Sequence, residues 1–129
     1  MYVSETSGVV ITVKPAFLET ESDPDEGRYV WAYTVEIANT GTDPVQLLAR
    51  EWHITNALNH TEIVKGAGVV GEQPVINPGD RFSYTSGAPL TTPSGFMTGA
   101  YLLERCGQQF DADIPSFALD SPYGPATRH

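Results

Sequence analysis

The chain has 129 residues, of which 40% are hydrophobic and 18% are charged, a composition typical of folded globular proteins and not of disordered ones. Seven Lys and Arg residues stand against sixteen Asp and Glu residues, which gives a formal net charge of −9. Because nucleic acids and anionic membranes are bound chiefly through cationic side chains, this balance excludes both as partners.

The ends and the single cysteine bear on location and on domain number. The first eight residues lack a basic segment followed by an apolar run, and no apolar stretch is long enough to span a membrane, so we expect a cytoplasmic protein. Cys106 is the only cysteine and has no partner for an internal disulfide, which favours a reducing compartment. We predict one domain over residues 1–129, with a core at 3–122 and a loose tail at 123–129.

Short runs of alternating apolar residues follow one another along the chain. Residues 9–13 begin a strand, and residues 28–39 show the clearest alternation, with Trp31 and its neighbours at every second position on one face. Residues 45–56 form a second long strand in which Arg50 shares a face with Leu48, Trp52 and Ile54. Trp31 and Trp52 are interpreted as core anchors. Shorter strands are predicted at 62–64, 75–76, 82–84, 97–103, 109–114 and 117–119.

Turn signals separate these runs. Residues 39–44 are rich in turn formers, and Asn77-Pro78-Gly79-Asp80 fits a type II turn, in which proline sets the first central φ and glycine adopts the positive one. Arg105 to Gln108 is another turn, and Pro115 ends a strand. No helical pattern exceeds a single turn. The sequence therefore predicts an all-β antiparallel sandwich of the immunoglobulin or fibronectin type III kind, with seven to eight strands.

Eight segments together carry a family resemblance: SDP at 22–24, RYVWAY at 28–33, IANTG at 37–41, QLLAREW at 46–52, GAGVVGEQP at 66–74, YTSG at 84–87, LTTPSGFM at 90–97 and IPSF at 114–117. In combination they resemble the ApaG family, which is also called CorD. The resemblance covers about residues 3–122, and it departs from the family pattern at Arg50-Glu51-Trp52, where the family usually has Arg-His-Trp. That departure weakens any metal-ligand argument that uses the histidine.

The resemblance implies a fibronectin type III-like sandwich and implies neither an enzyme nor a cofactor. The family is linked to cobalt and magnesium tolerance. Similar domains occur in eukaryotic F-box proteins and in a polymerase-interacting protein, which implies a module that binds other proteins.

Gly66, Gly68 and Gly71 spell GxGxxG, the letters of a dinucleotide-binding loop. That site needs a helix that opens at the loop, and Pro74 and Pro78 leave no room for one. Two interpretations remain: a tight loop between strands, or a loop whose backbone N–H groups bind an anion together with Arg50. Arg50 itself either forms an internal ion pair or packs a snorkelling stem on an aromatic side chain, or it is a recessed cation that binds a carboxylate or phosphate.

The acidic stretch at 19–27 contains Asp23, Asp25 and Glu26, which are weak candidate ligands for a divalent cation. As a calcium loop that starts at Asp23 it fails, because its sixth position is Arg28, where glycine is required. A solvated acidic connection is the alternative. The three histidines, His53, His60 and His129, and Cys106 lack the spacing of a zinc site, so no metal is assigned.

The segment Ser86–Gly95 combines two prolines and two glycines with several hydroxyl residues, and we interpret it as a long loop. It is either a recognition loop or a packed crossover between sheets. The candidate interaction residues within it are Ser86, Gly87, Leu90, Thr92, Pro93 and Gly95.

Two functions follow. The first is a non-enzymatic binding module with an unknown protein partner. The alternative is a module for a small ligand, either a phosphorylated metabolite such as pyrophosphate or a nucleoside polyphosphate, or a divalent cation. No cofactor is expected, and the exposed strand edges leave a monomer and a homodimer both open.

Overall fold

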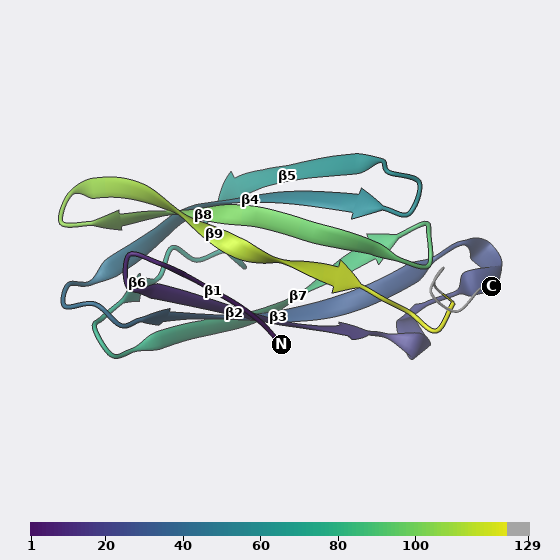
Figure 1. Cartoon of the computed structure of the whole chain (residues 1–129), viewed down its shortest axis with the longest axis horizontal. Helices are drawn as coiled ribbons and strands as arrows, with labels where there is room; N and C mark the ends of the chain where they lie inside the picture. Colours follow the sequence, from purple (N-terminus) through teal and green to yellow (C-terminus); the bar gives the residue numbers. More distant parts are fainter. Residues whose placement is uncertain (124–129) are drawn as a thin grey trace.

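Two antiparallel β-sheets packed face to face form the architecture of the computed structural model, which describes residues 1–123 (Figure 1). The first sheet has the order β1-β2-β3-β7, with β1 at Tyr2–Thr6, β2 at Val9–Phe17, β3 at Tyr29–Asn39 and β7 at Arg81–Leu90. The second has the order β5-β4-β8-β9, and β6 also pairs with β4. Its bounds are β4 Val45–Asn56, β5 Thr61–Ala67, β6 Val75–Ile76, β8 Gly95–Arg105 and β9 Gln108–Leu119.

The predicted antiparallel sandwich is confirmed, with nine strands in place of seven to eight. The additional strand is β1, whose alternate residues Tyr2, Ser4 and Thr6 carry little apolar character and gave no strand signal. The prediction that Pro115 ends a strand is wrong, because the segments predicted at 109–114 and 117–119 form the single strand β9, which accommodates Pro115 at a bulge. Two single 3-10 turns, η1 at Glu19–Glu21 and η2 at Pro24–Glu26, are the helical elements of residues 1–123. No helix in that part of the chain is long and apolar enough to cross a membrane.

The core lies between the sheets and follows the alternation of the sequence. Trp31 and Trp52 are 1% and 3% exposed, as predicted for core anchors. Trp52 meets Tyr33 and Phe117 edge-on, with ring centroids 5.3 and 5.9 Å apart, so an aromatic cluster joins β3, β4 and β9. Val30, on the opposite face of β3, is also buried, and its backbone carbonyl accepts a hydrogen bond from Leu18.

A β-bulge between Leu47 and Ala49 corrects one predicted face. The sequence placed Leu48 in the same row as Arg50, but the bulge shifts the register of β4 on β8, and Leu47 is the fully buried residue. A single extra residue reverses side-chain direction in a strand, since successive side chains alternate. Arg50 and Trp52 remain on the core-facing side of β4, where Arg50 lies opposite the buried Tyr101.

The prediction of a loop at Ser86–Gly95 is wrong for most of these residues. Ser86–Leu90 belongs to β7 and Gly95 begins β8, so only residues 91–94 connect the two sheets. Pro89 is tolerated because its partner Val30 turns its backbone groups away from β7: its N–H donates to Ser22 Oγ and its carbonyl accepts from Leu18. Val30 and Pro89 are thus a non-hydrogen-bonded pair, and the nitrogen of Pro89 faces the free edge of the sheet.

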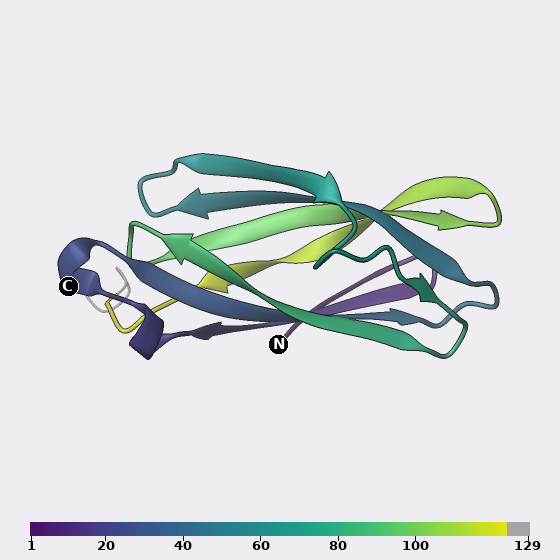
Figure 2. The same cartoon turned by 180° about the vertical axis from the view of Figure 1, so that it is seen from behind.

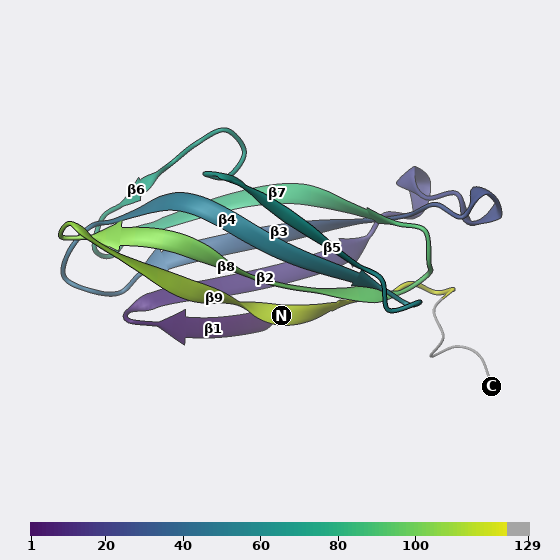
Figure 3. The same ribbon diagram turned by 90° about the horizontal axis from the view of Figure 1, so that it is seen from above.

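The two sides of the sandwich are closed in different ways. On one side β9 packs against β1 and β2, and Ser4 Oγ donates to the carbonyl of Asp113 at 2.7 Å. On the other side the chain between β5 and β6 runs across the gap between β7 and the second sheet, as Figure 2 shows from behind. Seen from above, this connection stands out along one long edge of the stacked sheets (Figure 3). The glycine motif therefore lies on the side of the sandwich that the strands leave open.

Candidate functional site

The glycine motif is the predicted site that the structure explains most fully. Gly68 and Gly71 have backbone φ values of +63° and +80°, which residues other than glycine rarely adopt. A Cβ on Gly68 would in addition overlap the backbone carbonyl of Glu72. Gly66 has a different reason, because a Cβ there would come within 2.8 Å of the guanidinium of Arg50. The motif is built around a turn and around one arginine.

The structure brings Arg50 and the glycine motif together, as the sequence suggested. The half-buried guanidinium lies over Gly66, and its Nη1 donates to the carbonyls of Ala67 at 3.1 Å and of Gly68 at 2.8 Å. Arg50 therefore satisfies carbonyl oxygens at the start of the loop. Within residues 1–123 the guanidinium has no carboxylate partner, so Arg50 bonds to backbone carbonyls in place of the internal ion pair that was one expectation for it.

Several backbone N–H groups of the loop are also used inside the protein. Gly68 donates to the carbonyl of Leu48, while Val69 and Glu72 donate to each other's carbonyls, all at 2.8 Å. Between these bonds the Val69 side chain is fully buried in the core. The loop thus fills the open side of the sandwich with Val69, and the tight-loop interpretation accounts for its hydrogen bonds.

Three tyrosines lie behind Arg50 in the core. Tyr33, Tyr84 and Tyr101 are each under 9% exposed, and the Tyr84 and Tyr101 hydroxyls are hydrogen-bonded to each other. Burial raises the pKa of all three phenols above the ordinary value, most strongly for Tyr101, and the charge of Arg50 opposes that rise. The cluster is therefore neutral at physiological pH and supplies hydroxyl groups without an anionic charge.

The acidic segment forms η1 and η2 and ends at Gly27, which has a φ of +67°. Asp23, Asp25 and Glu26 lie on this surface connection as predicted. Within residues 1–123 no three His, Cys, Asp or Glu side chains are grouped closely enough to hold a metal ion. His129, the last histidine, lies outside the described residues.

The short connection that remains of the predicted loop is internally bonded. Thr92, 7% exposed, accepts a hydrogen bond on its Oγ1 from the backbone of Ala57 at 3.0 Å and donates to the Ser94 carbonyl at 2.8 Å. The carbonyl of Pro93 accepts from Ser121 Oγ. These bonds tie residues 91–94 to both neighbouring segments, as expected for a packed crossover between the sheets.

The largest hollow described lies elsewhere, on the outer face of the second sheet, and sequence reasoning missed it. It has a volume of about 490 Å³. Small or apolar residues from adjacent strands, Ala49, Ala100 and Leu102, form its floor, since the pairing of β4 with β8 sets them side by side. The remaining lining residues are Arg50, Glu51, Lys65, Gly66 and Asp111. Alanines on separate strands give no local signal, so only the register could reveal this surface.

The rim of this outer-face hollow carries a small ionic network. His53 Nε2 lies 2.6 Å from Glu51 Oε2, and Lys65 Nζ lies 3.7 Å from Glu51 Oε1. The hydrogen bond with His53 lowers the pKa of Glu51, with a smaller contribution from Lys65. Two apolar side chains on the same face, Ile63 and Phe96, are 55% and 46% exposed. An apolar floor, a charged rim and exposed apolar neighbours thus share one face.

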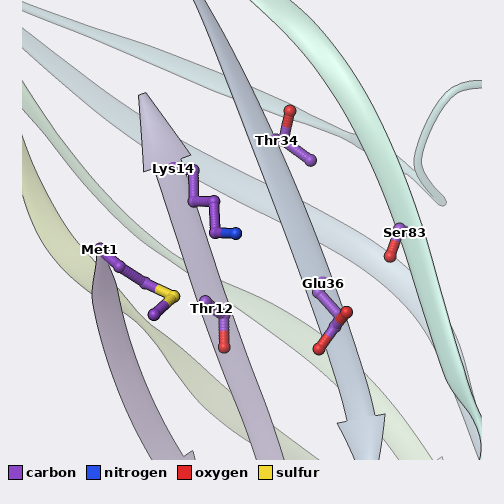
Figure 4. A pocket seen from close by; sticks show the side chains of 6 residues that line it. All are labelled: Met1, Thr12, Lys14, Thr34, Glu36 and Ser83. Carbon is purple, nitrogen blue, oxygen red and sulfur yellow. The ribbon is translucent and has the colours of Figure 1, made fainter. Parts of the chain in front are cut away.

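Two further hollows lie on other parts of the surface. One, of about 180 Å³, lies on the outer face of the first sheet, where Lys14 and Glu36 stand among threonine and serine hydroxyls (Figure 4). The other, of about 210 Å³, is a cleft between the start of β5 and the end of β7. Ile54, His60 and Glu62 line it from one sheet, and Pro89 and Leu90 from the other. Leu90 is the one candidate interaction residue that contributes to this cleft.

The fold and these surfaces define a fibronectin type III-like β-sandwich domain. A family model for the ApaG domain matches residues 19–105. The chain belongs to the ApaG family. It is 63% identical over 123 residues to Protein ApaG of Maricaulis maris and 54% identical over 124 residues to Protein ApaG of Methylorubrum extorquens, covering 95% of the chain and of the relative in each case.

Solved structures agree with this assignment. The crystal structure of the putative ApaA protein from Bordetella pertussis superposes with a TM-score of 0.86 at 43% identity, over 88% of this chain and 94% of that one. The sequence resemblance and the predicted fold are therefore both confirmed.

Proposed function

We propose that this ApaG-family chain is a non-enzymatic domain that binds a protein partner through the outer face of the β5-β4-β8-β9 sheet. The observation that carries the proposal is the outer-face hollow of about 490 Å³, with its floor of Ala49, Ala100 and Leu102. Protein interfaces typically have an apolar centre inside a polar rim, and Glu51, Lys65 and Asp111 supply such a rim.

The exposed apolar side chains on the same face support the proposal. Ile63 and Phe96 are large side chains whose exposure costs solvation free energy in the isolated domain. Covering them with a partner recovers that free energy. The link of the family with cobalt and magnesium tolerance would then be indirect and act through the partner.

Affinity capture from cells of the source organism tests the proposal with a matched pair of variants. Ala100→Glu places a charged side chain in the outer-face hollow, and Thr12→Glu places the same side chain in the hollow of the first sheet. We expect a partner that is captured by the wild type and by Thr12→Glu and lost with Ala100→Glu. Equal capture by both variants would remove this face from the proposal.

A second candidate, a small-ligand module, is favoured by one observation. The volume of the outer-face hollow lies within the range of ligand sites, and Lys65 supplies a cation to its lining, while the guanidinium of Arg50 lies on the core-facing side of the sheet. Glu51 and Asp111 on its rim repel phosphoryl groups, which ranks this candidate below a protein partner. An amide NMR titration with cobalt, magnesium, pyrophosphate and diadenosine tetraphosphate tests it. Saturable shifts confined to residues 49–51 and 65–71 would support this function, and their absence would leave protein binding.

A further inference from the structure

The edge strands of the two sheets differ in how they are protected against pairing with another chain. Unprotected edges present free backbone donors and acceptors, and proteins blunt them with short strands, prolines, bulges or charges. β1 has only five residues, and β7 turns the nitrogen of Pro89 outward. β9 has a bulge at Pro115 and exposed carboxylates at Asp111 and Asp113. Each of these three edges has at least one such feature.

β5 differs from them in its backbone. It has seven residues, contains no proline or bulge and pairs with β4 in one unbroken register, and its two charges lie on opposite faces, Lys65 on the outer face and Glu62 on the core-facing side. It stands at the end of its sheet, and within residues 1–123 β4 is the only strand paired with it. The free edge of β5 is therefore a regular edge that neither a proline nor a bulge interrupts.

The hydrogen bonds at the two ends of β5 determine which backbone groups face outward. The N–H of Asn56 donates to the His60 carbonyl, and the N–H of Gly68 donates to the Leu48 carbonyl. Hydrogen-bonded and non-bonded pairs alternate along an antiparallel ladder. The register between these end points then directs the N–H and C=O of Thr61, Ile63, Lys65 and Ala67 away from β4. Among these groups the Ala67 carbonyl already accepts a hydrogen bond from Arg50 Nη1. The same four residues have exposed side chains.

The two faces beside this edge differ in chemistry. On the core-facing side, an added strand would meet the cleft of about 210 Å³, where Glu62 stands beside the apolar side chains of Ile54 and Leu90. A Lys or Arg side chain fits such a cleft, since its stem packs on apolar surface while its charge meets the carboxylate. On the outer face, the position opposite Ile63 favours a β-branched apolar residue.

We infer that the free edge of β5 binds an extended segment of the partner as an additional strand, in which Lys or Arg facing the cleft alternates with β-branched apolar residues facing outward. The inference rests on the proposed function and names the class of segment that the partner contributes. A basic segment is favoured over a second copy of the chain, because two copies would each have a net charge of −9.

The experiment uses a fluorescent nine-residue peptide in which Lys alternates with Val, titrated into the full chain. Ile63→Pro removes one outward N–H and leaves the ladder with β4 intact, while Ile63→Thr keeps that N–H and the β-branched shape. We expect saturable binding that Ile63→Pro weakens about tenfold and that Ile63→Thr changes by less than about threefold. Glu62→Gln should weaken binding about two- to fivefold. A peptide in which Glu replaces Lys should bind at least about tenfold more weakly.

Amide hydrogen exchange gives a readout that depends on no variant. Bound peptide should protect the amides of Thr61, Ile63, Lys65 and Ala67 in the wild type. Protection confined to β8 or β9, equal binding by the Pro and Thr variants, or no saturable binding up to about millimolar peptide would overturn the inference. A wild-type dimer that Ile63→Pro converts to monomer would also overturn it, because a second copy would then occupy the edge.

The capture experiment separates this inference from the proposed function. If Ala100→Glu loses the native partner while Ile63→Pro retains it, the outer face binds a protein without strand addition, and only the inference fails. If both variants retain every captured protein, the proposed function fails as well. Loss of the partner with Ile63→Pro but not with Ile63→Thr supports the inference.

Discussion

The glycines of the GxGxxG motif differ in how much space a Cβ would have, and this difference gives a first prediction. We expect Gly68→Ala to destabilise the domain by about 2–3 kcal/mol, because the residue has a positive φ and its Cβ would meet the Glu72 carbonyl. Gly71→Ala is the matched control, since it shares the positive φ but has open space, and should cost about 1 kcal/mol. Urea unfolding midpoints measure both. Equal losses would contradict the steric argument.

Arg50 supplies a second prediction. Replacement with Met keeps the packing of the stem and removes the two hydrogen bonds to the carbonyls of Ala67 and Gly68, so we expect a loss of about 1–3 kcal/mol in the free energy of unfolding. Arg81→Met is the control, because within residues 1–123 the Arg81 side chain makes only an exposed ion pair with Glu36 at 3.4 Å and should change stability by less than about 0.5 kcal/mol. Chemical denaturation compares the two variants. If Arg50→Met lost no more free energy of unfolding than the control, the loop would be stable without the hydrogen bonds from Arg50.

The tyrosine cluster predicts how stability depends on alkaline pH. Burial raises the folded-state pKa of Tyr33, Tyr84 and Tyr101 above about 10, the value in the unfolded chain. Above pH 10 the unfolded state therefore releases protons that the folded state keeps, so the stabilisation is complete below that pH and is lost as pH rises. Each such group contributes a slope of about 1.4 kcal/mol per pH unit.

Unfolding midpoints measured between pH 9 and 11.5 test this expectation. Tyr84→Phe should be less stable near neutral pH, since it leaves the Tyr101 hydroxyl without its partner, but its stability should fall less steeply above pH 10. Tyr29→Phe, at a half-buried position of the same strand as Tyr33, is the control. Parallel pH curves for wild type and Tyr84→Phe would show that the cluster does not titrate with unfolding.

At residue scale the sequence predicted the association of Arg50 with the glycine motif but not its chemistry. The letters and the following prolines were enough to exclude a dinucleotide site. Whether Arg50 would face a ligand or the loop carbonyls depends on the position of its guanidinium over Gly66, which the register of β4 on β5 determines. No local pattern carries that information.

At the scale of elements, the strands with strong alternation were predictable and the edges were not. β3 and β4 carry large β-branched and aromatic residues, because β3 supplies the core from the first sheet and β4 supplies it from the second. β1 and the second half of β7 are edge segments, in which small or polar residues suffice because one side meets solvent. The outer-face hollow was missed for a related reason, since it arises from the register between strands.

The proline in β7 gives a prediction about the edge of that strand. Pro89→Val should lose no ladder hydrogen bond, because the nitrogen of Pro89 already faces outward, and should cost only about 0.4–1 kcal/mol through the entropy of the unfolded chain. The new outward N–H should, however, promote self-association at high concentration. Light scattering tests this against Ser83→Val, which adds the same side chain to β7 without changing the edge. Equal scattering by the two variants would contradict the protective role of Pro89.

At the scale of the whole molecule, the net charge of −9 opposes compaction through self-repulsion. We therefore expect the melting temperature to rise by about 2–5 °C between 0.01 and 0.5 M sodium chloride, as salt screens these charges. The double variant Glu21→Gln/Asp25→Asn lowers the formal charge from −9 to −7 and should show a smaller rise. Differential scanning calorimetry measures both, and a melting temperature independent of salt would show that the acids do not act collectively.

The contact between β1 and β9 has a consequence for how the protein is made. Ser4 and Asp113 are joined by a hydrogen bond across 109 positions of the chain, and β9 covers β2 as well as β1. A ribosome that adds about 5–20 residues per second leaves on the order of ten seconds between the appearance of these strands. During that interval the apolar face of β2 lacks its covering strand. The nascent chain must therefore remain soluble with one side of the sandwich unsealed, until its last strand emerges from the exit tunnel.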